Sequence, residues 1–142
     1  MKKVVFISVL FVWDMSFAGI MGLWKGPSLV YKQGKLSVCE MSLYLKQKPH
    51  KVETLTSVVC KENESPLRLM SQSFDVDKNE IIHEHIKGRI GPSNLTAKAA
   101  YNKNHHIKVN MKVNHNLMMY DFTENIYNNL SVIQGALIKQ DF

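Results

Sequence analysis

Few residues in this chain of 142 have types and spacing that could do chemistry. His83 and His85 stand two apart in a stretch expected to be a strand, so their side chains would project from one face and could share a metal ion. Two histidines are too few for a metal site, and nothing in the sequence places a third ligand beside them. We therefore interpret them as surface histidines and expect no metal and no cofactor.

Glu84 lies between the two histidines. The expected strand runs from Ile81 to Ile86, and if Ile82 and Ile86 mark its buried face, Glu84 shares that face and points inward. A buried carboxylate is costly unless it is paired, so an inward Glu84 would be a candidate polar contact for a ligand. The alternative is an edge-like strand or a wet barrel mouth, which leaves Glu84 in water.

Aromatic side chains are the other candidate ligand contacts. Trp24, Tyr44 and Tyr101 would line a pocket in one interpretation and would belong to the core and its rim in the other. No serine stands in a G-x-S-x-G nucleophile elbow, and no cysteine is expected to be free. We therefore name no catalytic residue and do not expect an enzyme.

The two cysteines lie on a predicted hairpin, on alternating runs that extend from Leu36 to Lys61. A hairpin centred after Pro49 pairs residues whose numbers sum to 99, which places Cys39 opposite Cys60. Cross-strand neighbours on one face have Cβ atoms roughly 4.5–5.5 Å apart, which a small adjustment brings within disulfide reach. Without a CxxC motif, metal or redox chemistry is disfavoured, and the sequence predicts a structural disulfide.

The N-terminus predicts export. Met1-Lys2-Lys3 is a short positive segment, Val4 to Trp13 is an apolar run, and Ser16-Phe17-Ala18 has the form of a cleavage site. We expect a signal peptide over residues 1–18 and a single periplasmic or secreted domain over residues 19–142. A membrane anchor is the alternative, but about ten apolar residues are too few to cross a bilayer core that needs about 20. No stable membrane insertion of the mature chain is therefore expected.

The net charge is +6, and nearly all of the basic residues are lysines. They are spread along the chain, and arginine, which most often contacts bases and phosphates, is scarce, so nucleic-acid binding is not expected. Lysines on solvent-facing strand positions discourage edge pairing, which is consistent with a monomer. A basic surface could also help the protein approach anionic polymers or membranes.

After the signal, apolar residues recur with a period of two almost everywhere. The clearest strand runs from Ile107 to Val113, and eight or nine such strands fit an antiparallel meander. We predict an all-β, up-and-down barrel of about eight strands, because closure removes exposed edges; a two-sheet β-sandwich is the alternative. Breaks in pairing are expected at Pro66 and over Thr123 to Asn129.

Several short motifs carry a family resemblance. They are the opening Gly22-Leu23-Trp24-Lys25-Gly26, Gly34 before the strand that carries Cys39, Cys60 after the hairpin, Gly88 and Gly91 in a later turn, and an apolar final strand. With these the chain resembles small exported calycin-like, or lipocalin-like, β-barrel proteins of α-proteobacteria. It departs from their pattern around His83, where a tryptophan beside the acidic residue would be expected.

Two functions follow from export and the barrel outline. The resemblance implies a non-catalytic binding module that holds a small apolar or amphipathic ligand, since an eight-stranded barrel can just hold one. The alternative is a secreted interaction protein, an inhibitor or a host-directed effector, that engages a protein partner through its outer surface and loops.

Overall fold

The computed structural model describes residues 19–61 and 63–141, with residues 63–70 in their backbone only. The expected signal peptide, residues 1–18, lies outside the described residues. Within them strands are the only regular elements, and no helix is long and apolar enough to cross a membrane. The strands are β1 (Gly22–Lys32), β2 (Lys35–Lys48), β3 (Lys51–Cys60), β4 (Asn63–Asp77), β5 (Glu80–Ile82), β6 (Ile86–Ile90), β7 (Asn94–Asn102), β8 (His105–Asn114), β9 (Leu117–Ile126) and β10 (Asn129–Lys139).

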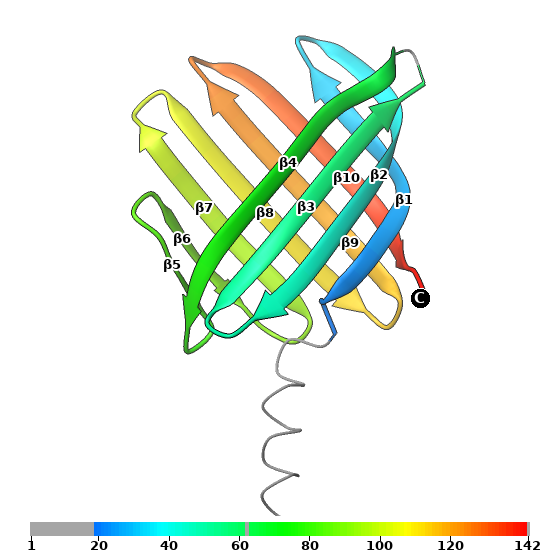
Figure 1. Ribbon diagram of the computed structural model, residues 1–142. Coiled ribbons are helices and arrows are strands. Elements are labelled where there is room, and N and C mark those ends of the chain that lie inside the picture. Colours follow the sequence, from blue (N-terminus) through cyan, green and yellow to red (C-terminus); the bar gives the residue numbers. More distant parts are fainter. Residues whose placement is uncertain (1–18, 62, 142) are drawn as a thin grey trace, which may run out of the picture.

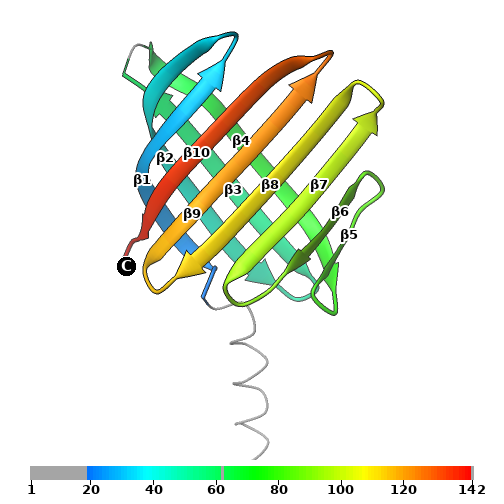
Figure 2. The ribbon, with the colours of Figure 1, turned by 180° about the vertical axis from the view of Figure 1, so that it is seen from behind.

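The sheet is a closed antiparallel barrel (Figure 1). Each strand pairs with its neighbours in sequence, and β10 pairs with β1. Figure 2 shows the wall of β7 to β10 from the other side. The predicted all-β barrel is confirmed and the sandwich is wrong, while the strand number is ten rather than about eight. We call the end where β1 begins and β10 ends the terminal end, and the opposite end the rim end.

The cysteine hairpin has the predicted register. Cys39 on β2 lies opposite Cys60 on β3, and Met41 lies opposite Val58. The two cysteines form a disulfide with an S–S distance of 1.97 Å and a sequence separation of 21. Both are only 4% exposed, so the bridge faces the interior of the barrel. The predicted disulfide is confirmed.

The expected strand from Ile81 to Ile86 is instead two short strands, β5 and β6, with residues 83–85 between them. The interruption resets the alternation, so Ile81 and Ile86 are each 7% exposed, whereas Ile82 is 55% exposed. The Glu84 side chain is 85% exposed. The expected inward orientation of Glu84 is therefore wrong, because the residue sits in a connection rather than in a strand.

Two expected breaks are also wrong. Pro66 does not end pairing but lies opposite Val59 in β4, at a register shift where a proline without an N–H is tolerated. The segment after Phe122 continues β9 as far as Ile126. Only Tyr127 and Asn128 form the turn, with φ of 50° and 67°, as in the type I′ turns that match the twist of a hairpin.

The interior of the terminal end is filled by large apolar side chains. Ile20, just before β1, is fully buried there, and Trp24 Nε1 donates a hydrogen bond of 3.0 Å to the Ile20 carbonyl oxygen. Leu43, Met118 and Leu137 are also fully buried in the same cluster. This end of the barrel is therefore plugged by the chain itself.

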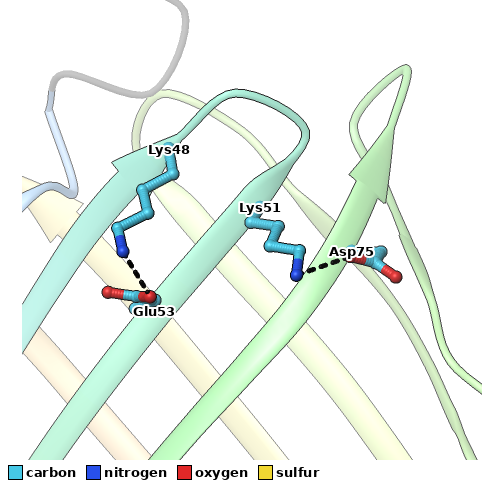
Figure 3. Close-up of polar contacts among 4 residues, drawn as sticks. All are labelled: Lys48, Lys51, Glu53 and Asp75. Carbon is cyan, nitrogen blue, oxygen red and sulfur yellow. Dashed lines mark ion pairs between the residues drawn. The ribbon is translucent and has the colours of Figure 1, made fainter.

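The outer surface near the β2–β3 turn carries two ion pairs (Figure 3). Lys48 Nζ lies 2.9 Å from Glu53 Oε1, and Lys51 Nζ lies 4.0 Å from Asp75 Oδ1. The hydrogen bond from Lys48 lowers the pKa of Glu53 below its usual value, although all four groups are well exposed. Such surface pairs add little to stability, so the interior must hold the fold.

Candidate ligand-binding site in the barrel lumen

A cavity remains inside the barrel because β7 faces the lumen with two alanines. Alternation directs Ala97 and Ala99 of β7 inward, and Ile107 and Val109 of β8 face the lumen beside them. Phe74, Ile81, Ile86 and Ala99 form a second apolar cluster, separate from the one that plugs the terminal end. The cavity lies where the two clusters meet.

The cavity has a volume of about 50 Å³. Its apolar wall comes from β6 to β9 and from Phe74 of β4, and its polar wall comes from Thr54, Thr56 and Gln72 of β3 and β4. At roughly 10–15 Å³ per water-sized group, the space holds about four such groups, well below the roughly 300–1,000 Å³ of sites for drug-sized ligands. The lining residues are Thr54, Thr56, Gln72, Phe74, Ile86, Leu95, Ala97, Ala99, Tyr101, Ile107, Val109, Met111, Tyr120 and Phe122.

A chain of ring side chains runs along the rim end beside this cavity. The ring centroids of His83 and His85 are 6.3 Å apart, those of His85 and Tyr101 are 5.7 Å apart, and those of Tyr101 and His105 are 5.0 Å apart. The Ala100 N–H donates a hydrogen bond of 3.1 Å to the His85 carbonyl oxygen, which ties the 83–85 connection to β7. Tyr101 belongs to both the rim and the cavity lining, so it links them.

His105 and Glu124 form the most enclosed polar contact of the rim. His105 Nε2 lies 3.0 Å from Glu124 Oε2, and the side chains are 28% and 13% exposed. The contact is a hydrogen bond when the imidazole is neutral and an ion pair when it is protonated. A partly buried acid and base beside an apolar cavity can hold the polar end of an amphipathic molecule.

The structure separates the residues proposed as ligand contacts. Tyr101 lines the cavity and is 39% exposed. Trp24 is fully buried in the plug, with Lys139 Nζ 5.5 Å from its ring centroid. Tyr44 lies on the outer face of β2, between the inward Leu43 and Leu45, and is absent from the lining.

His83 and His85 occupy the connection between β5 and β6 instead of a strand. The His85 N–H donates a hydrogen bond of 3.1 Å to His83 Nδ1, and His85 Nε2 lies 3.9 Å from Glu84 Oε2. Residues 19–61 and 63–141 contain no group of three histidine, cysteine or acidic side chains that could hold a metal ion.

His105 and Glu124 are rim residues that were not predicted from the sequence. The alternation of side chains along a strand could have predicted both. His105 lies two positions before the inward-facing Ile107, and Glu124 lies two positions after the inward-facing Phe122. The inward position of Glu124 was missed because the strand that begins at Leu117 was expected to end at Phe122.

Comparisons with known proteins identify the fold. No protein-family model matches the chain, and no curated protein matches it. Among solved structures, Rv2717c from M. tuberculosis superposes with a TM-score of 0.66 at 9% identity, covering 87% of this chain and 94% of that one.

A protein of unknown function from the DUF3598 family of Nostoc punctiforme superposes with a TM-score of 0.62 at 7% identity, over 86% of this chain. The match covers 48% of the Nostoc chain, so this protein spans about half of it. At these identities the likeness is one of fold alone: the chain has a barrel fold that recurs in distant proteins.

Proposed function

We propose that this protein is an exported, non-catalytic binding module that takes a small amphipathic ligand at the rim end of the barrel. The apolar end of the ligand enters the cavity, and its polar end stays among Tyr101, His105 and Glu124. One observation carries the proposal. Tyr101 lines the apolar cavity and also contacts His105, which pairs with the partly buried Glu124 at the rim. The disulfide supports export, because such bridges persist mainly in oxidising compartments.

The size of the cavity limits the ligand. At the ceiling of about 1.5 kcal/mol per atom, about four buried heavy atoms contribute at most about 6 kcal/mol of binding free energy. The tightest Kd that the cavity alone can give therefore lies between about 1 mM and about 1 µM. A tighter ligand must therefore gain the rest of its affinity at the rim. The proposal accordingly favours a slender apolar end with a polar head over a bulky apolar ring system.

Two substitutions on neighbouring positions of β7 test the lumen. Ala99 faces the cavity, whereas Ala100 is exposed on the outer wall. Ala99→Leu fills the cavity and is expected to weaken binding of the amphipathic dye trans-parinaric acid, a slender fluorescent polyene chain with a carboxylate head, about tenfold, which is about 1.4 kcal/mol of binding free energy. Ala100→Leu adds the same atoms outside and should leave the affinity unchanged.

Native mass spectrometry of the purified protein complements the dye titration by reporting any ligand retained from the producing cell. A protein that carries no adduct and binds no dye would refute the proposal. Equal dye affinity of the Ala99→Leu and Ala100→Leu proteins would also refute it, because the dye would then bind outside the cavity.

The outer wall favours a second candidate, a secreted protein that engages a protein partner. Leu29 lies opposite Val38 and Tyr31 lies opposite Leu36, and these four side chains are 39–63% exposed. Contiguous exposed apolar side chains are typical of interaction surfaces. A partner that copurifies with the wild-type protein from the exported fraction, and is lost with Val38→Lys, supports this candidate; equal recovery with both proteins argues against it.

A further inference from the structure

The outer wall of β6, β7 and β8 carries a row of three lysines in direct register. Lys87 lies opposite Lys98, and Lys98 lies opposite Lys108. All three are exposed, and neighbouring strands are about 4.8 Å apart, so the three side chains leave the wall within about 10 Å of one another. Like charges directly opposite each other are destabilising, so this arrangement has a cost in the free protein.

A second row runs parallel to the first along the same wall. Arg89 lies opposite Thr96, and Thr96 lies opposite Asn110. One row is therefore fully cationic, whereas the other begins with Glu80 opposite Arg89 and continues with a hydroxyl and an amide. The Asn110 Oδ1 atom of this row is buried and has no hydrogen-bond partner.

The two rows border a groove of about 670 Å³. Glu80 is the one acid among its lining residues, against four bases. Across the described part of the chain, no ion pair joins Lys87, Arg89, Lys98 or Lys108 to a carboxylate. With four bases and one acid, the groove therefore carries a net charge of +3.

We propose that this basic groove binds an anionic oligosaccharide built from uronic acids. Each uronic acid unit carries a carboxylate together with hydroxyl groups, which matches one row of lysines beside one row of hydroxyl, amide and guanidinium groups. Lysine is a point charge that holds a carboxylate without demanding the planar geometry of an arginine fork. This site lies outside the barrel and is separate from the ligand proposed for the lumen.

Two other anionic partners fit the groove less well. A nucleic acid backbone carries one charge per about 3.4 Å of each strand, and would leave charges facing the mostly neutral second row. A membrane surface is flat, whereas the outer wall of a closed barrel is convex and meets a plane over a narrow strip. Both partners are outcomes of the test.

The test measures binding of tetragalacturonic acid to the purified protein by calorimetry at low and moderate salt. We expect 1:1 binding that weakens with salt, as for any site built from exposed charges. Lys98→Gln removes the central charge and should weaken binding about two- to fivefold, the effect of one exposed ion pair. The triple variant K87Q/K98Q/K108Q should weaken it by about tenfold or more.

A matched triple variant, K25Q/K46Q/K61Q, removes the same charge from exposed positions elsewhere on the barrel. We expect it to keep the wild-type affinity, and a loss equal to that of the groove variant would overturn the site. Absence of binding at low salt would overturn the proposal. A short DNA duplex or phosphatidylglycerol vesicles that bind as tightly as the oligosaccharide would overturn the assignment of a sugar.

Thermal unfolding separates loss of binding from loss of folding. Because the lysine row is repulsive, the groove triple variant should unfold at the wild-type temperature or slightly above it. An unfolding temperature well below that of the wild type would contradict the repulsion argued for the row.

Discussion

Breaking the Cys39–Cys60 disulfide is expected to lower the unfolding free energy by about 3 kcal/mol. The estimate follows from the loop-entropy relation for a closed loop of about the observed sequence separation of 21. For a chain of this size the loss corresponds to a fall of roughly 10 °C in Tm. The register of β2 and β3 should survive, because all ten residue pairs of the hairpin remain available without the bridge.

Urea unfolding of the oxidised and the reduced wild-type protein isolates the bond, because the two forms differ in nothing else. The midpoint should fall on reduction, and the slope should change because the reduced unfolded chain is less compact. The double variant C39A/C60A serves as a control, since it should show no response to reductant. Oxidised and reduced proteins that agree within about 0.5 kcal/mol would refute the loop-entropy argument for this hairpin.

Three further predictions concern the interior, the barrel seam and a surface pair. Leu43→Ala should cost about 2–5 kcal/mol in urea unfolding, whereas Leu36→Ala, on the outer face of the same strand, should stay within about 0.5 kcal/mol; equal costs would contradict the inward face assigned to β2. Gly26→Ala should cost about 1–3 kcal/mol, because the added Cβ would overlap the Ala136 carbonyl oxygen where β10 closes on β1; wild-type stability would contradict that close approach. Lys48→Gln should raise the pKa of Glu53 toward its usual value in an NMR titration. The wild-type pKa is lowered, so the pair stabilises the fold at neutral pH, and that contribution is lost as the pH falls through the pKa of Glu53; an unchanged pKa in the variant would exclude Lys48 as its cause.

The sequence predicted the barrel where the alternation is unbroken. Ile107 to Val113 alternate over most of β8, and the turn of the cysteine hairpin has only two residues, which sets the register of its strands. In both cases the local sequence is enough to predict which side chains face inward or which residues pair, without knowledge of the neighbouring strands.

The prediction failed where a turn lies inside an apolar run. Ile81, Ile82 and Ile86 read as one strand, yet residues 83–85 interrupt it, and the interruption moves Ile82 and Glu84 outward. The rim was missed for a related reason. His105 meets Glu124 only because β8 pairs with a β9 that extends beyond Phe122, and pairing between strands is set by the whole sheet.

Strand β7 contributes to both proposed sites through its two faces. Ala97 and Ala99 give the lumen its space, while Thr96 and Lys98 stand in the two rows of the outer groove. Because successive side chains of a strand point to opposite sides, a change at position 99 reaches the lumen and a change at position 98 reaches the groove. Ala99→Leu should therefore weaken dye binding without changing the affinity for tetragalacturonic acid, and Lys98→Gln should do the reverse. If either variant altered both affinities, the two ligands would share one site, and the separation of lumen and groove argued from the strand alternation would be wrong.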